Sequence, residues 1–190
     1  MPRNRYLWIV VSPARYVRLD RMQRILLTLL LALIPVLASA TLDKPLTKGA
    51  RIAFLGMTFI DTSTEGAYDG ERSDQTARLR LLEETTRQRL RQEGFEVLDN
   101  QPIADELAGT TNPAHCYGCE LRMAERLGAD YVLVGEVQKV SNLILSINLV
   151  LRDVRSGEAL RALAVDIRSN TDQSWLRGLN YIFKNHFFKS

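Results

Sequence analysis

The stretch from residue 143 to residue 152 alternates strictly, and this pattern limits the fold more than any other feature of the 190-residue chain. Every second side chain is apolar: Leu143, Leu145, Ile147, Leu149 and Leu151. The side chains between them are mixed: Ile144, Ser146, Asn148, Val150 and Arg152. Because successive side chains of a strand point to opposite faces, one face is buried and the other is only partly covered. The segment therefore predicts a strand in a half-covered antiparallel sheet.

The remaining segments predict a single α/β domain over residues 41–190. Further strands are expected at residues 51–61, 95–98, 130–140 and 159–168, with a hairpin turn at Ser156 and Gly157 before the last one. Residues 62–74 read as a loop, after which Ser73 or Asp74 caps a helix that runs to residue 93. Shorter helices are expected at residues 102–107 and 116–127, and a final helix follows Thr171 or Asp172. The chain thus ends in an antiparallel meander and a helix.

The first forty residues have the parts of a secretory signal peptide. Arg21 and Arg24 precede an apolar run at residues 25–37, and small residues follow at 38–40. Thirteen apolar residues are too few for a membrane-spanning helix, which needs about 20. We therefore expect cleavage before Thr41, a periplasmic or secreted protein, and no stable membrane insertion after cleavage. Residues 1–21 make an unusually long leader, and our hypothesis is that translation starts at Met22.

The basic charge of the chain belongs to this leader. The whole sequence carries a formal charge of +3, but six of its 25 basic and one of its 22 acidic side chains lie in residues 1–40. The remaining 150 residues therefore carry a net charge of −2. Nucleic-acid binding rests on a basic surface that displaces counterions, so we expect no nucleic-acid partner.

The order of elements over residues 51–188 resembles the N-terminal domain of TolB and the related domains of CsgG and periplasmic outer-membrane lipoproteins. The resemblance implies a three-layer α/β domain built around a mixed five-stranded sheet. Several short motifs are also similar to an uncharacterised family of exported bacterial proteins, and they lie at residues 116–120, 127–130, 137–145, 152–153 and 165–175. Some members of that family are similar to accessory proteins encoded beside quinoprotein alcohol dehydrogenases. The family resemblance implies export and a biological context, and no activity.

Cys116 and Cys119 form a CxxC motif, the only motif with chemistry of its own. In an exported protein the spacing favours a structural disulfide, whose four-residue loop acts mainly through local rigidity. Redox exchange is the alternative, because a thiol at a helix N-terminus beside His115 has a lowered pKa. Metal binding would need His115 or His186 in addition, without a second CxxC. We predict no metal site and no cofactor.

Polar side chains on the mixed face of the meander form a candidate binding surface. Asn148, Arg152, Asp166 and Arg168 are expected on the same uncovered side of neighbouring strands. Further polar side chains are expected nearby at a hairpin: Gln138, Lys139, Ser141 and Asn142. Two interpretations stay open, a recognition surface for a partner and an ordinary solvated face with an Asp-Arg cross-strand pair.

The sequence contains no Walker loop, no GxGxxG motif and no nucleophile elbow. We therefore predict no catalytic residues and a non-enzymatic accessory protein that acts through a protein partner, in an envelope or quinoprotein system. A thiol–disulfide or metal-handling factor using Cys116 and Cys119 is the alternative function. A small-molecule binding module is a third possibility.

Overall fold

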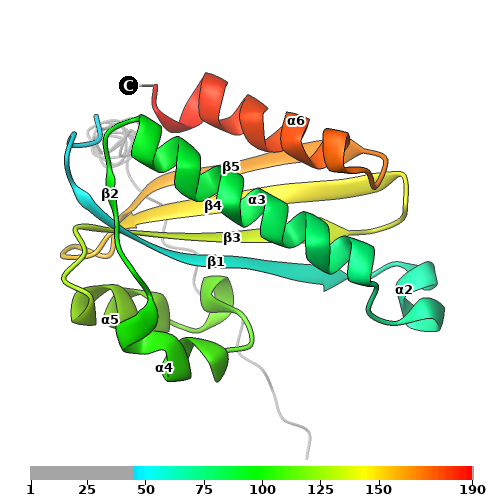
Figure 1. The fold of residues 1–190 in the computed structure, drawn as a ribbon, viewed down its shortest axis with the longest axis horizontal. Coiled ribbons are helices and arrows are strands. Elements are labelled where there is room, and N and C mark those ends of the chain that lie inside the picture. Colours follow the sequence, from blue (N-terminus) through cyan, green and yellow to red (C-terminus); the bar gives the residue numbers. More distant parts are fainter. Residues whose placement is uncertain (1–44, 190) are drawn as a thin grey trace, which may run out of the picture. The chain divides into compact units, whose positions relative to one another are not determined.

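The computed structural model describes residues 45–189, and these form a five-stranded sheet with helices on both faces (Figure 1). The predicted signal peptide, its cleavage before Thr41 and the start at Met22 lie outside the described residues. Within residues 45–189, no helix is long and apolar enough to cross a membrane.

The sheet is mixed, as predicted. Its strands are β1 (Arg51–Asp61), β2 (Glu96–Val97), β3 (Tyr131–Lys139), β4 (Ile144–Asp153) and β5 (Ala159–Arg168). They lie in the order β2-β1-β3-β4-β5. The first three strands are parallel, whereas β3, β4 and β5 pair antiparallel as the predicted meander.

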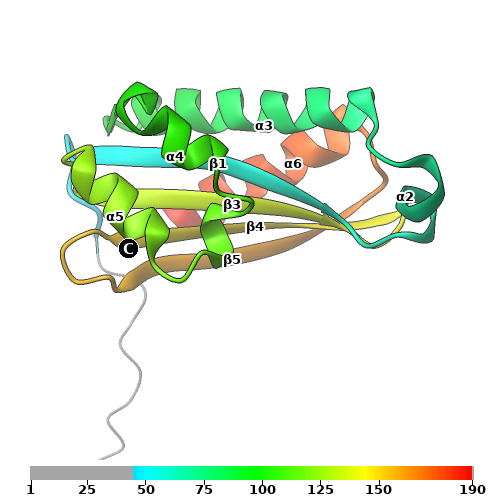
Figure 2. The ribbon, with the colours of Figure 1, turned by 90° about the horizontal axis from the view of Figure 1, so that it is seen from below.

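The helices make the other two layers, which confirms the three-layer α/β class. One face of the sheet carries α3 (Ser73–Gln92), α6 (Asp172–Ile182) and the π-helical turn η3 (Phe183–Phe187). The opposite face carries α4 (Ala104–Ala108), α5 (Cys119–Arg126) and two 3-10 turns, η1 (Gln101–Ile103) and η2 (Pro113–His115). Figures 1 and 2 show these two groups on different sides of the strands, with the short α2 (Thr64–Asp69) just beyond the end of β1.

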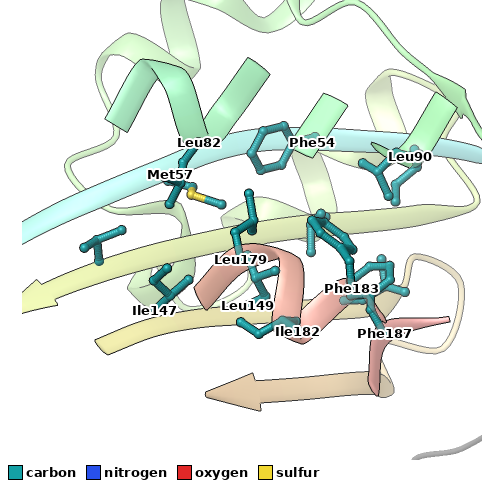
Figure 3. Packing of buried hydrophobic residues seen from close by; sticks show 14 of the residues in the cluster. Phe54, Met57, Leu82, Leu90, Ile147, Leu149, Leu179, Ile182, Phe183 and Phe187 are labelled. Carbon is teal, nitrogen blue, oxygen red and sulfur yellow. The ribbon is translucent and has the colours of Figure 1, made fainter. Parts of the chain in front are cut away.

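The larger core lies under α3 and α6 (Figure 3). The predicted apolar side of β4 is fully buried there, because Leu145, Ile147, Leu149 and Leu151 each have 0% of their surface exposed. The 3.6-residue period of α6 adds a matching stripe, consisting of Trp175, Leu179 and Ile182. A smaller core on the opposite face joins β1 and β3 to α5 through Ala53, Val132, Met123 and Ala124.

Several predicted boundaries differ from the structure. Neither Ser73 nor Asp74 caps α3, since Ser73 is its first residue and Arg72 stands at the N-cap without a side-chain cap bond. The predicted loop at residues 62–74 contains α2, whose N-cap Ser63 accepts a hydrogen bond from the Gly66 amide at 3.0 Å. The predicted strand residue Leu143 lies in the β3–β4 hairpin, before β4 begins. Thr171 does cap α6, as predicted.

Candidate functional site: an open face of the sheet

The sheet face that carries α4 and α5 is uncovered over β5. Helix α5 packs on β3 and β1, and Val150 of β4 packs against the same apolar cluster. On this side of β5, alternate side chains are all exposed: Ala162, Ala164, Asp166 and Arg168. Strand register aligns Asp166 with Ser146 and Gln138, and aligns Ala164 with Asn148. We call the surface formed by Gln138, Ile144, Ser146, Asn148, Ala162, Ala164, Asp166 and Arg168 the open face.

The polar side chains of the open face are not used inside the domain. Among residues 45–189, no hydrogen bond or ion pair engages the side chains of Gln138, Asn148, Asp166 or Arg168. The anticipated cross-strand Asp-Arg pair is absent from residues 45–189, because strand register aligns Asp166 with Ser146, and Arg152 of β4 contacts Glu120 instead. A partner protein can therefore bind these groups of the open face without breaking a hydrogen bond or ion pair within the domain.

The prediction for Lys139 is wrong. Lys139 lies on the same face of β3 as Val137, whereas Gln138 lies on the opposite face. The Lys139 side chain therefore points to the α3 side of the sheet. Its side chain is only 1% exposed, and its Nζ lies 2.9 Å from Oδ2 of Asp61 at the end of β1. Burial raises the pKa of Asp61, but hydrogen bonds from Ser63 and Lys139 outweigh it and hold that pKa below its ordinary value. Lys139 therefore has a structural role.

The β3–β4 hairpin borders the open face and carries exposed apolar side chains. Ser141 and Asn142 are used locally, because Oγ of Ser141 accepts from the Leu143 and Ile144 amides and Asn142 donates to Glu65 at 3.4 Å. Beside them, 53% of Val140, 69% of Leu143 and 43% of Ile144 is exposed. No pattern in the sequence predicts this exposed apolar group, which we call the hairpin tip (Val140, Leu143 and Ile144).

Arg152 lies at the other border of the open face and is engaged within the domain. Its Nη1 donates to the Gly157 carbonyl oxygen at 3.1 Å, and its Nε lies 3.6 Å from the nearly buried carboxylate of Glu120. The pair ties the start of α5 to β4. Arg152 is therefore a positioning group at the edge of the surface, unlike Asp166 and Arg168.

Cys116 and Cys119 form the predicted disulfide. The helix begins at Cys119, so the prediction of a helix from Cys116 is wrong, and Cys116 ends the turn η2. Between the two sulfurs, Tyr117 adopts a φ of 55° and is fully exposed, followed by Gly118 at 90°. A bulky residue in the left-handed region is uncommon. The disulfide therefore holds an exposed aromatic ring on a short constrained turn.

Potential metal ligands also meet at this turn. Cys116, Cys119 and Glu120 are the one group of three potential ligands found close together in the described part of the chain. Both sulfurs are in the disulfide, and the thiolate is the form that binds a metal. His115 is directed elsewhere, with Nε2 3.0 Å from Glu136, and the ring of His186 packs on Tyr181.

Comparisons with known proteins give a family and several distant likenesses. A family model, DUF3280, described as "Protein of unknown function (DUF2380)", matches residues 50–187. No curated protein matches the chain.

Solved structures that resemble the chain include the LpoB C-terminal domain from Salmonella enterica, with 17% identity, a TM-score of 0.49, and coverage of 67% of this chain and 88% of that one. Lipoprotein GNA1162 from Neisseria meningitidis is 21% identical over 72% of this chain and 94% of that one, with a TM-score of 0.46. TolB from Acinetobacter baumannii is 14% identical over 75% of this chain and 30% of its own, with a TM-score of 0.34. All three TM-scores are below 0.5, so the fold assignment rests on the strand order and layers described above.

Proposed function

The chain belongs to DUF3280, a family whose description states no activity, and we propose that it is an exported, non-enzymatic protein that binds a protein partner. The observation that carries the proposal is the open face of β4 and β5, with the hairpin tip at its edge. The side chains of Gln138, Asn148, Asp166 and Arg168 make no hydrogen bond or ion pair within residues 45–189, and the hairpin tip is exposed.

The chemistry of this surface suits a protein partner. Protein interfaces combine a desolvated apolar centre with a polar rim that supplies hydrogen bonds. Here the hairpin tip provides the apolar part of the surface at one end, and Asn148, Asp166 and Arg168 on the adjoining open face provide donors and acceptors. Ala162 and Ala164 are small, so a partner can approach the backbone of β5 closely. Exposed apolar groups with a polar rim mark interaction sites on soluble proteins.

The compartment is part of the same proposal. We place the protein in the periplasm because of the predicted signal peptide and because the disulfide suits an oxidising compartment. The motif resemblance to accessory proteins of quinoprotein dehydrogenases supports such a system, or another envelope system, as the context for the partner.

Photo-crosslinking in living cells tests the proposal. A photoreactive phenylalanine analogue at Ala164 places the crosslinker on the open face, and the same analogue at Ala77 places it on the exposed side of α3. We expect a discrete crosslinked adduct from position 164 and none from position 77. Equal adducts from both positions, or none from position 164, would contradict the proposal.

A further inference from the structure

The edge of β1 away from β3 has almost no neighbouring strand. β1 is 11 residues long, but β2 pairs only with Arg51 and Ile52. No other strand among residues 45–189 lies on this edge. The carboxyl half of β1 is therefore an open sheet edge, which in proteins is a template for an added strand.

Two hydrogen bonds show which backbone groups face this edge. The Phe54 carbonyl accepts from Nδ2 of Asn100 at 2.8 Å, and after a bulge the Met57 amide donates to Oε1 of Glu83 at 2.8 Å. The Thr62 amide points the other way, since it donates to the Lys139 carbonyl of β3 at 2.9 Å. Alternation along the strand therefore turns the backbone groups of Phe59 and Asp61 toward the open edge.

A cleft of about 650 Å³ runs along this part of β1. Gln75, Thr76 and Leu79 of α3 form one wall, and residues of the 107–113 segment, including Leu107 and Thr111, form the other. The floor is β1 itself from residue 55 to residue 61. Five residues of extended chain span roughly 15 Å, so the cleft accommodates a short strand beside residues 57–61.

Gln75 gives a second, independent indication of a ligand. It lies at the sheet-facing side of α3, with only 2% of its surface exposed, and it lines the cleft. Its Nε2 has no hydrogen-bond partner among residues 45–189. A buried amide without a partner costs free energy, so a polar group that enters the cleft and pairs with Gln75 recovers it.

Two of the three charged side chains that line the cleft are paired within the domain, and the third, the exposed Glu71, accepts a hydrogen bond from the Thr76 hydroxyl at 3.2 Å. Asp61 is paired with Lys139 at 2.9 Å, and Arg72 is paired with Asp74 at 3.0 Å. The walls thus combine uncharged hydrogen-bonding groups with apolar side chains. Their electrostatic complement is an uncharged segment with free backbone donors and acceptors.

We propose that this cleft binds an extended, uncharged segment of a partner protein, which pairs with the open edge of β1 as an added strand. The site differs from the open face, because it lies at the edge of β1 away from β3, whereas the open face lies on one face of β3, β4 and β5. The chain then has two binding sites, one on a sheet face and one at a sheet edge.

The test uses the full chain and an N-acetylated, C-amidated hexapeptide of alternating valine and threonine. Amide hydrogen exchange is measured at ~1 mM peptide, a concentration that detects weak binding. We expect the exchange of the Phe59 and Asp61 amides to slow by about tenfold or more, because they become hydrogen-bonded. The same peptide with alternate backbone nitrogens methylated gives no protection. Unchanged exchange at these two amides, protection confined to β5, or self-association of the chain overturns the proposal.

Two matched variants test the part played by Gln75. Gln75→Leu removes the buried amide, whereas Gln88→Leu makes the same change at an exposed position of the same helix. We expect Gln75→Leu to weaken peptide binding by about fivefold to tenfold, the value of one hydrogen bond, and Gln88→Leu to leave it unchanged. Equal affinities for the two variants overturn the assignment. Crosslinking from position 164 reports on the open face, so failure of one site is distinguishable from failure of the other.

Discussion

The ion pair of Lys139 and Asp61 predicts that loss of one partner destabilises the protein more than loss of the other, because the two side chains differ in exposure. The Lys139 side chain is 1% exposed and that of Asp61 is 17% exposed. Replacement of Asp61 by Asn leaves the Lys139 ammonium buried without a counter-charge. Breaking a buried pair in this way costs about 3–5 kcal/mol.

The reverse change is milder. After Lys139→Met, the Asp61 carboxylate still accepts from the Ser63 amide at 2.9 Å and from the Ser63 hydroxyl, and it retains contact with water. Retained hydrogen bonds limit the loss to about 1–2 kcal/mol. The double variant removes both charges, so we expect its stability to lie near that of Lys139→Met alone.

Urea unfolding at neutral pH measures the difference. With an m-value of about 2 kcal/mol/M, Asp61→Asn unfolds at a midpoint roughly 1 M lower than Lys139→Met. Equal midpoints, the reverse order, or a double variant less stable than Asp61→Asn would refute the reasoning, since each result means that Lys139 reaches water in the folded protein.

Three further predictions concern stability and redox state. The pKa of Asp61 is below its ordinary value, so the ionised carboxylate stabilises the folded protein above about pH 4, and this stabilisation is lost as the pH falls through the folded pKa. Between about pH 2.5 and 5, the free energy of unfolding should therefore rise less steeply with pH in Asp61→Asn than in the unmodified protein. Replacement of both Cys116 and Cys119 by serine removes the disulfide that closes a four-residue loop, and it should lower the free energy of unfolding by about 2 kcal/mol without loss of partner binding. A disulfide that exchanges readily with glutathione buffers would instead support the redox alternative. Gly178→Ala places a methyl group against Ile167, and we expect a loss of about 1–3 kcal/mol in thermal unfolding, against none for an alanine at an exposed helix position.

Much of the fold follows from periodicity in the sequence. The period of two over β4 and the period of 3.6 over α6 both reflect burial on one side, so they predicted which residues form the larger core. Glycines in the segment before α3 suggested a loop, but Ser63 caps a short helix there. The hydrogen bonds of the Ser63 side chain stabilise the start of this helix, and the glycine content of the segment does not indicate them.

The candidate site was only partly predictable. Alternation in β3 places Lys139 and Gln138 on opposite faces of the sheet, so the burial of Lys139 follows from a pattern that the sequence contains. The exposure of Leu143 and Ile144 depends on which elements pack against the β3–β4 hairpin, and this is a tertiary property without a local pattern. For the same reason, the sequence did not indicate the cleft beside β1.

The most direct test of the proposed function is the affinity for the partner identified by crosslinking. Leu143→Ser changes the hairpin tip, and Leu81→Ser makes the same change at an exposed position of α3. Burying an exposed leucine at an interface contributes about 1.5 kcal/mol or more, so Leu143→Ser should raise the Kd by about tenfold or more. Leu81→Ser should leave the Kd unchanged. Equal Kd values for the two variants would contradict the claim that the partner binds at the hairpin tip and the adjoining open face.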